Sequence, residues 1–267
     1  MMRQEVPFHV ERLIISANGR TNEFTRACST STYVGCKSQE TLLQDSMADW
    51  MSRVPDATKL NEMTIPGTHN SAAYKYAEGS HFLCLRPAKM FVLCQDWTIE
   101  TQLNNGIRFF DVRLVANGGY LYMFHGQCSL NMLFDEFLDT VANFLNDHPT
   151  EAVLVKYQKA HGPKQLSDFI QAFKTARSFY SEYIWATYES IATIGDLRGK
   201  ISFVNKNEDG DIGLKMNMIS LSNVWSVSLA GGGGDDLDLE EKIKSIDDNF
   251  KKAANREAGK LHLTLTR

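Results

Sequence analysis

The sequence predicts an α/β protein whose main unit, residues 46–267, is a distorted or incomplete TIM-type (β/α) barrel. From Met47 onward, short β-prone runs alternate with longer amphipathic runs, which is the pattern of βα units that build a parallel sheet or barrel. This stretch is shorter than the ~250 residues of a complete eight-stranded barrel, and the chain ends directly on its last expected strand. We therefore expect a barrel that is open, or truncated at the C-terminus.

Strands and helices can be placed in order within this unit. Strands are expected at residues 62–66, 107–114, 120–124, 152–157, 200–205, about 219–227, and 261–266. A first helix carries apolar residues at helical spacing from Leu133 to Leu145 and ends before Pro149, because proline disfavours helical geometry in the preceding residue. The same spacing predicts further helices at residues 166–173 and 239–250.

The charge balance argues against one class of partner. The 267 residues include 28 Lys and Arg against 32 Asp and Glu, which gives a net charge of -4. Such a chain has no overall attraction for nucleic acid or for anionic lipid. We expect no nucleic-acid partner, and any recognition of phosphate has to be local.

The N-terminus and the cysteines bear on location. Residues 1–45 lack sustained helical or strand periodicity, so we expect a disordered N-terminal extension. The start of the chain has no apolar core of a signal peptide, and no apolar run is long enough for a spanning helix. The 5 cysteines are sparse, odd in number and without metal-ligand spacing, which favours reduced thiols. We expect a cytoplasmic protein, or one that meets a membrane only peripherally.

Four segments carry residues suited to chemistry. His69 follows an expected strand and the Pro-Gly pair 66–67, and His125 ends another strand before a glycine. Barrels place their chemistry at such strand ends. Asp111 and Arg113 alternate along one strand, which puts both on the same face. Lys156 interrupts an apolar strand and is rarely buried there without a partner, which a phosphate or a carboxylate would provide.

Cleavage of a phosphodiester by an internal hydroxyl needs these residue types. A base takes the proton of the hydroxyl, an acid protonates the leaving oxygen, and fixed positive charge stabilises the phosphate oxygens. Two histidines suit the first two tasks, and an arginine suits the third. Each residue also has a structural alternative: a histidine without a role, an ordinary ion pair, or a lysine on an edge strand. Their joint position at strand ends favours a functional site.

The motifs TIPGTHNS, GIRFFDVR, YMFHG, HPTEAVLVKY and IGDLRGKISFVNK occur in this order along the chain. They resemble the motifs of the phosphatidylinositol-specific phospholipase C X-domain family of the bacterial type, over about residues 47–267. The resemblance implies the barrel of the phospholipase C-like phosphodiesterases. It also implies cleavage of membrane phosphatidylinositol to diacylglycerol and inositol (cyclic) phosphate, with peripheral membrane contact.

The resemblance assigns candidate roles residue by residue. It makes His69 the general base, His125 the general acid and Arg113 the phosphate ligand. Asp111 would orient the acid histidine or its neighbours. The residues expected to bind the inositol headgroup are Lys156, Lys206, Asn223 and Trp225.

Two departures from the family pattern leave alternatives open. Asn70 stands where bacterial-type members usually have aspartate and is reminiscent of the calcium-dependent eukaryotic enzymes. Arg113, however, stands where those enzymes place an acidic residue, so we expect no metal and no cofactor, with calcium disfavoured. The missing final strand would bring an aspartate to His69. The main alternative is therefore a catalytically impaired X-domain protein that binds inositol lipids. A glycerophosphodiester-type enzyme would need clustered acidic residues after His69, which the sequence lacks.

Residues 79–97 form an apolar segment that also contains Arg86 and Lys89. In the family that the chain resembles, the corresponding segment is a rim that contacts the membrane. The resemblance therefore makes Phe82, Leu83, Phe91 and Trp97 candidates for membrane contact. The same composition suits a helix buried against the barrel wall.

Overall fold

The computed structural model describes residues 47–80, 84, 92–160, 166–186, 191–205, 213–214, 219–222, 236–255 and 260–264. The expected N-terminal extension, residues 1–45, lies outside these ranges. The strands are β1 (Gly67–Thr68), β2 (Phe109–Asn117), β3 (Tyr120–His125), β4 (Cys128–Leu133), β5 (Ala152–Lys159), β6 (Lys200–Asn205), β7 (Ile219–Ser222) and β8 (Leu261–Thr264). The α-helices are α3 (Ile99–Asn104), α4 (Phe134–Asp147), α5 (Leu166–Phe179), α6 (Ile194–Leu197) and α7 (Asp236–Ala254). Short 3-10 helices are η1 (Trp50–Arg53), η2 (Leu60–Glu62) and η5 (Ser181–Tyr183).

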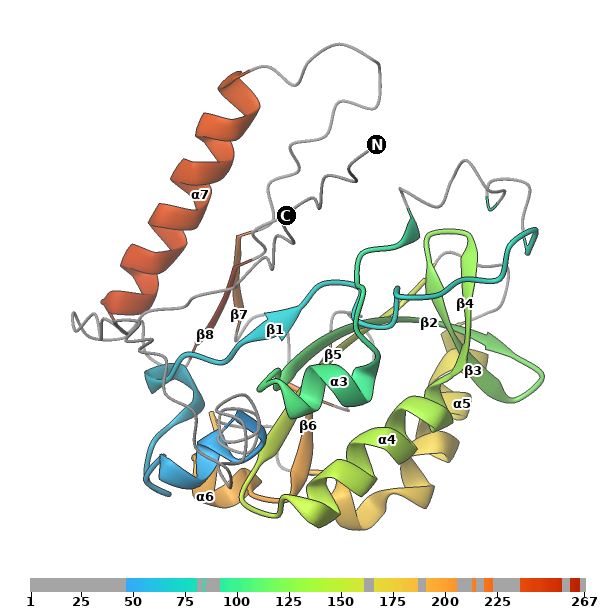
Figure 1. The fold of residues 1–267 in the computed structure, drawn as a ribbon, viewed down its shortest axis with the longest axis horizontal. Helices are drawn as coiled ribbons and strands as arrows, with labels where there is room; N and C mark the ends of the chain where they lie inside the picture. Colours follow the sequence, from blue (N-terminus) through green and yellow to red (C-terminus); the bar gives the residue numbers. More distant parts are fainter. Residues whose placement is uncertain are drawn as a thin grey trace, which may run out of the picture.

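The described strands form an open α/β sheet (Figure 1). Its order is β4-β3-β2-β5-β6, and β1 pairs with the first part of β2. Strands β1, β2, β5 and β6 are parallel, whereas β3 and β4 form an antiparallel excursion at one edge. Strands β7 and β8 make a separate parallel pair beside α7. The prediction of a distorted, incomplete barrel is confirmed.

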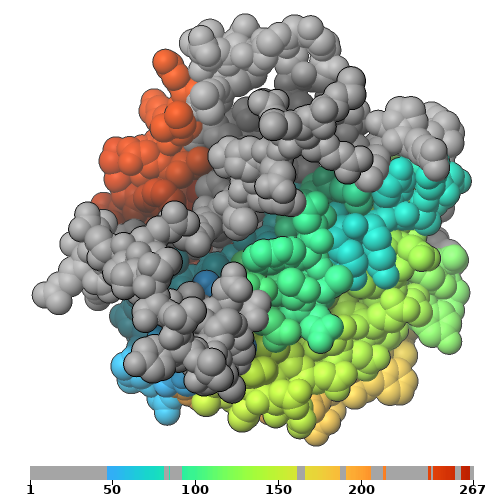
Figure 2. All heavy atoms as spheres, in the orientation of Figure 1, coloured from blue at the N-terminus to red at the C-terminus, as the bar shows by residue number. Residues whose placement is uncertain are grey.

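Helices α4 and α5 cover one face of the sheet, and α3 packs beside α4 (Figures 1 and 2). Their apolar sides meet alternate residues of the strands, including Phe110, Val112 and Val155, in one buried cluster. Phe134 and Phe173 stack at the centre of this cluster. The three helices predicted from apolar spacing are all present, as α4, α5 and α7, and α4 ends just before His148 as expected.

The opposite face of the sheet changes character along the strands. At the start of the strands it is apolar, where Phe109 and Leu154 join a second buried cluster with Met51 and Leu60. Asp111 follows Phe109 on this face of β2. There it lies beside Lys156 of β5 in the parallel register. Polar groups therefore replace apolar ones towards the ends of the strands.

Two expectations about strands were wrong. Residues 62–66 do not form a strand, because Glu62 closes the 3-10 turn η2 by donating its N–H to the Lys59 carbonyl. Pairing with β2 starts only at Gly67. Strand β4 was not predicted from the sequence. The side chains of its alternate residues Cys128, Leu130 and Met132 are buried against α4. The expected strand at 219–227 is described only as far as Ser222. Within the described ranges, no helix is both long and apolar enough to cross a bilayer.

A buried ion pair between Arg108 and Glu151 connects the sheet to η1. Arg108 and Glu151 are both fully buried, with Nε and Nη2 of the arginine each 2.9 Å from Glu151 Oε2. Arg108 also donates to the Leu103 carbonyl at 2.7 Å, and Glu151 Oε1 accepts from the Met51 N–H at 3.1 Å. One carboxylate thus ties the start of β5 to η1 and to the residue preceding β2.

We predict that Glu151→Ala lowers the free energy of unfolding by about 3–5 kcal/mol, because it leaves the Arg108 charge buried without its counter-ion. Urea unfolding measures the loss. Asp147→Ala, at the exposed end of α4, is the control and should change the same free energy by no more than about 0.5 kcal/mol. Equal effects of the two substitutions would contradict the prediction.

Candidate functional site

Two strands meet end to end along one edge of β2, and both predicted catalytic histidines lie at this junction. β1 pairs with β2 at Phe109 and Phe110, whereas β3 pairs with it from Leu114 onward. Residues 111–113 lie between these two paired stretches. His69 directly follows β1, and His125 is the last residue of β3. The strand pairing therefore brings the two histidines to either side of this part of β2.

The His69 ring is oriented by a carboxylate. Its Nδ1 lies 2.9 Å from Asp111 Oδ2, and its backbone carbonyl accepts a hydrogen bond of 2.7 Å from Gln95 Nε2. A carboxylate only accepts hydrogen bonds, so Nδ1 carries the hydrogen and Nε2 presents a lone pair. This is the tautomer that a general base at Nε2 requires.

Asp111 is fully buried and has three polar partners in addition to His69. Lys156 Nζ lies 2.7 Å from its Oδ1, and the Asn70 backbone N–H donates to its Oδ2 at 3.3 Å. Ser71 Oγ accepts from the Asp111 backbone N–H at 2.8 Å. Burial by itself raises the pKa of Asp111, but the His69 hydrogen bond and the Lys156 charge outweigh it and hold this pKa well below the usual value. Asp111 is therefore ionised whenever the protein is folded near neutral pH.

Asn70 links His69 to a cysteine. Its backbone is in the left-handed region, with φ of 44°, and its side chain is turned into the site. Nδ2 lies 2.9 Å from His69 Nε2 and 3.7 Å from Cys94 Sγ. The two amide hydrogens therefore serve the histidine lone pair and the sulfur, whereas Oδ1 is buried without a hydrogen-bond partner among the described residues.

The His125 ring is held by neutral groups. Its Nδ1 lies 2.8 Å from the Val92 carbonyl oxygen and 3.8 Å from Cys94 Sγ. A carbonyl only accepts, so Nδ1 carries a hydrogen and Nε2 is the atom available to exchange a proton with a ligand. No carboxylate within the described part of the chain pairs with His125.

Arg113 supplies positive charge on the same face of β2 as Asp111. Its Nε is buried and has no hydrogen-bond partner in the described residues. Lys156, by contrast, forms an ion pair with Asp111. Of the two partners predicted for this lysine, a phosphate or a carboxylate, the structure shows the carboxylate. The guanidinium of Arg113 therefore remains available to bind an anion.

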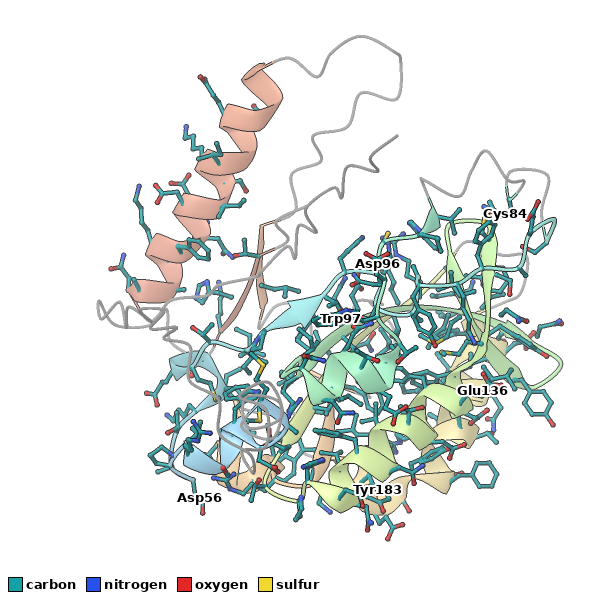
Figure 3. All side chains as sticks on the ribbon, in the orientation of Figure 1. Asp56, Cys84, Asp96, Trp97, Glu136 and Tyr183 are labelled. Atoms are coloured by element: carbon teal, nitrogen blue, oxygen red, sulfur yellow. A yellow bond between two sulfur atoms is a disulfide. The ribbon has the colours of Figure 1, made fainter. Side chains whose placement is uncertain are left out.

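The structure places some predicted residues differently and leaves others out. Asp111 contacts His69 and not His125, so His69 has a carboxylate from β2 and does not depend on a later strand for one. Trp97 lies at the N-terminal end of α3 with its residue 38% exposed (Figure 3). The predicted site residues outside the described ranges are Lys206, Asn223, Trp225, Phe82, Leu83 and Phe91.

Three groups of the site were not found from the sequence: the Val92 carbonyl, Cys94 and Gln95. They belong to one short segment, residues 92–95, whose composition had suggested either a membrane rim or a helix buried against the barrel wall. The Cys94 backbone N–H donates to the Ala73 carbonyl at 2.9 Å, which holds this segment against the turn that follows His69. These contacts could not be predicted from the sequence, because every residue has a main-chain carbonyl and no residue type shows which carbonyl will be used.

A disulfide connects Cys84 to Cys128, the first residue of β4, beside His125. Cys84 and Cys128 are bonded, with their Cα atoms 5.5 Å apart, so the prediction of reduced thiols was wrong for this pair. Cys128 begins β4 and pairs with His125 in the β3–β4 register. Of the cysteines that the structure describes, Cys94 is the one outside a disulfide. The described residues contain no group of three His, Cys, Asp or Glu side chains placed to hold a metal.

Comparison with known proteins identifies the family. The model of the PI-PLC X family (PI-PLC X 1) matches residues 57–194, more than half of the chain. This chain belongs to the PI-PLC X family. The 1-phosphatidylinositol phosphodiesterase of Listeria monocytogenes is 29% identical over 163 residues, 59% of this chain and 48% of the relative. PI-PLC X domain-containing protein 2 of Homo sapiens is 27% identical over 132 residues, 41% of this chain and 43% of the relative.

Solved structures agree with the fold of this PI-PLC X chain. The phosphatidylinositol-specific phospholipase C of Listeria monocytogenes has a TM-score of 0.66 at 21% identity, over 82% of this chain and 81% of the other. A Staphylococcus aureus phosphatidylinositol-specific phospholipase C has a TM-score of 0.66 at 18% identity, over 83% of this chain and 78% of the other. In sequence, the chain spans about half the length of the curated relatives it matches.

We predict a pH-dependent loss of stability for Asp111→Asn, which leaves the Lys156 ammonium buried without its counter-ion. Near neutral pH the free energy of unfolding should fall by about 3–5 kcal/mol. Because the native pKa of Asp111 is depressed, its contribution is complete above the unfolded pKa of about 3.9 and is lost as the pH falls through the lower native value. The difference between parent and variant should therefore shrink below about pH 4.

Urea unfolding at a series of pH values measures this difference. Asp96→Asn removes an exposed carboxylate near the same segment and is the matched control, with little effect expected at any pH. A difference for Asp111→Asn that does not change with pH would show that the carboxylate charge is not what stabilises the site.

Proposed function

We propose that this PI-PLC X protein is a phosphodiesterase that cleaves phosphatidylinositol-type lipids to diacylglycerol and inositol (cyclic) phosphate. The observation that carries the proposal is the different acceptor at Nδ1–H of each histidine, the charged Asp111 carboxylate at His69 and the neutral Val92 carbonyl at His125. His69 presents a lone pair at Nε2 beside a buried carboxylate, and the Nδ1–H of His125 is fixed by a carbonyl. The similarity to bacterial proteins named 1-phosphatidylinositol phosphodiesterase supports the choice of substrate.

The proposed reaction uses each group once. His69 Nε2 takes the proton of the inositol 2-hydroxyl, whose oxygen attacks the phosphorus. His125 Nε2–H protonates the diacylglycerol oxygen as its bond to phosphorus breaks. Arg113 donates to the phosphate oxygens, whose charge grows in the transition state. Before this, the hydroxyl replaces the Asn70 amide at His69 Nε2, a contact of 2.9 Å. We assign Lys206, Asn223 and Trp225 to the headgroup.

We propose that the reaction needs no metal ion. Both oxygens of Asp111 already accept hydrogen bonds, from His69 and from Lys156. A calcium ion at this carboxylate would meet the Lys156 ammonium at 2.7 Å from the same group. The Arg113 guanidinium on the same strand face would repel a cation further. Arg113 supplies the charge that a metal supplies in other phosphodiesterases.

The compartment in which the protein acts is a further part of the proposal. Disulfides persist in oxidising environments and are rare in the cytosol. The Cys84–Cys128 bond therefore favours an oxidising compartment over the cytoplasm expected from the sequence. Because the net charge of -4 gives no attraction to an anionic bilayer, we propose that apolar side chains make a peripheral contact.

Release of diacylglycerol from phosphatidylinositol vesicles, with and without excess chelator, tests the function. We expect release that the chelator leaves unchanged. His69→Ala and His125→Ala should each lower turnover at least ~10²-fold, the lower end of what general acid or base catalysis contributes. Thermal unfolding of His125→Ala should match the parent, whereas His69→Ala should unfold at a lower temperature because it removes a hydrogen-bond donor from buried Asp111, and both variants should still be folded at the assay temperature. His148→Ala changes a histidine paired with Asp49, away from the site, and is the control.

Two other outcomes have definite meanings. Vesicle binding without turnover would favour the alternative of a catalytically impaired inositol-lipid-binding protein, in which the Asn70 amide blocks the base. Turnover that requires calcium would overturn the metal-independent mechanism and would make Asn70 and Asp111 candidate ligands.

We predict that the exposed side chain of Trp97, together with the aromatic side chains expected to contact the membrane within residues 79–97, governs vesicle binding. A large apolar side chain taken fully out of water contributes about 1.5–3 kcal/mol, so Trp97→Ser should weaken binding to phosphatidylinositol vesicles about tenfold. Phe82→Ser and Phe91→Ser, at the other predicted contacts, should act in the same direction. Cleavage of a short-chain soluble substrate should stay nearly unchanged.

Phe179→Ser is the matched control for this prediction. Phe179 is 76% exposed at the end of α5, near Tyr183, which Figure 3 shows at the lower edge of the molecule and away from Trp97. Equal loss with soluble and vesicle substrates, together with a lower melting temperature, would show that the substituted residues belong to the core.

A further inference from the structure

The thiol of Cys94 lies between the two histidines of the site. Its sulfur is 3.8 Å from His125 Nδ1, 3.7 Å from Asn70 Nδ2 and 3.8 Å from the Val92 carbonyl oxygen. These separations are within hydrogen-bonding range for sulfur. Cys94 is half-buried and is not part of a disulfide.

The donors and acceptors around this sulfur form one consistent pattern. The Val92 carbonyl accepts from His125 Nδ1–H and faces the S–H of Cys94. The Asn70 amide donates one hydrogen to Cys94 Sγ and the other to His69 Nε2. The base and the acid are therefore connected through two intervening side chains, an amide and a thiol.

His125 depends on these neutral neighbours for its orientation. A catalytic histidine is commonly oriented by a carboxylate at the ring nitrogen that does not react, as His69 is by Asp111. The charged groups nearest the link, Asp111 and Lys156, belong to the His69 side, and Arg113 lies two residues further along β2. Among the described residues, the groups that contact the His125 ring nitrogen Nδ1 are the Val92 carbonyl and the Cys94 sulfur.

We propose that Cys94 is a positioning residue for His125 and that, together with Asn70, it couples the state of the acid to that of the base. This inference rests on the proposed function. When His69 Nε2 gains a proton it becomes a donor, and the Asn70 N–H can no longer bind there. Rotation of the amide then presents its Oδ1, which is buried without a hydrogen-bond partner among the described residues. In that orientation Oδ1 accepts from His69 Nε2–H and from the Cys94 S–H together.

Kinetics of Cys94→Ala and Cys94→Ser test the positioning role. We expect Cys94→Ala to lower kcat about tenfold with KM little changed, the lower end of what losing an outer-shell hydrogen-bond partner costs. The alkaline limb of its kcat against pH profile should move to lower pH, because an acceptor near Nδ1–H is lost. Cys94→Ser keeps a donor and an acceptor and should recover most of kcat.

Leu93→Ala is the matched control. It loosens the same segment at a half-buried apolar position and removes no polar contact to His125. It should leave the pH profile unchanged even where it lowers thermal stability. The same shift in Leu93→Ala as in Cys94→Ala would overturn the positioning role, and so would a parent-like profile in Cys94→Ala.

Nuclear magnetic resonance tests the coupling without any substrate. In the full chain, His69→Gln should shift the pH titration of the His125 ring signals, and this shift should disappear when Cys94 is also replaced by alanine. An equal shift in both backgrounds would overturn the coupling. If the parent protein releases no diacylglycerol, the proposed function fails, whereas the titration still decides whether Cys94 links the two histidines.

Discussion

The buried carboxylate of Asp111 is the constraint on which the site depends. An ionised group with no exposed surface is strongly destabilising unless charges and hydrogen bonds replace its water. Here the replacements come from different parts of the chain: Lys156 from β5, and His69 and the Asn70 N–H from the turn after β1. The parallel register that sets Asp111 beside Lys156 therefore fixes the position of His69 as well.

The two histidines differ in what surrounds them, and the difference follows from the strand pairing. His69 follows a strand parallel to β2 and reaches the β2 carboxylate. His125 ends an antiparallel strand and reaches the segment 92–94, which offers a carbonyl and a thiol. A carboxylate strengthens a base, whereas neutral dipoles orient an acid without a full opposite charge to retain its proton. The disulfide at Cys128 and the hydrogen bond from Cys94 to Ala73 both tie that region to the site.

Much of the fold was predictable because it rests on patterns local to the chain. Apolar spacing located α4 and α5, and the apolar run of β5 with Lys156 in it was evident from its composition. β4 was missed because Cys128, Leu130 and Met132 alternate with polar residues over only 6 positions, directly beside a helix. The prediction of a strand at 62–66 was wrong because the Glu62 carboxylate accepts a hydrogen bond from the Lys59 N–H, which favours a turn there.

The sequence by itself determined the class of fold and which residue types are available for chemistry, since strand and helix periods and the motifs around His69, Arg113 and His125 are local. The tertiary structure decided which partner each of them has. Asp111 pairs with His69 and not with His125, Lys156 pairs with Asp111, and Cys94 lies beside His125. The physical reason is that these contacts join segments 31 to 45 residues apart in sequence. Strand register and loop packing set their distances, and neither leaves a periodic signal in the sequence.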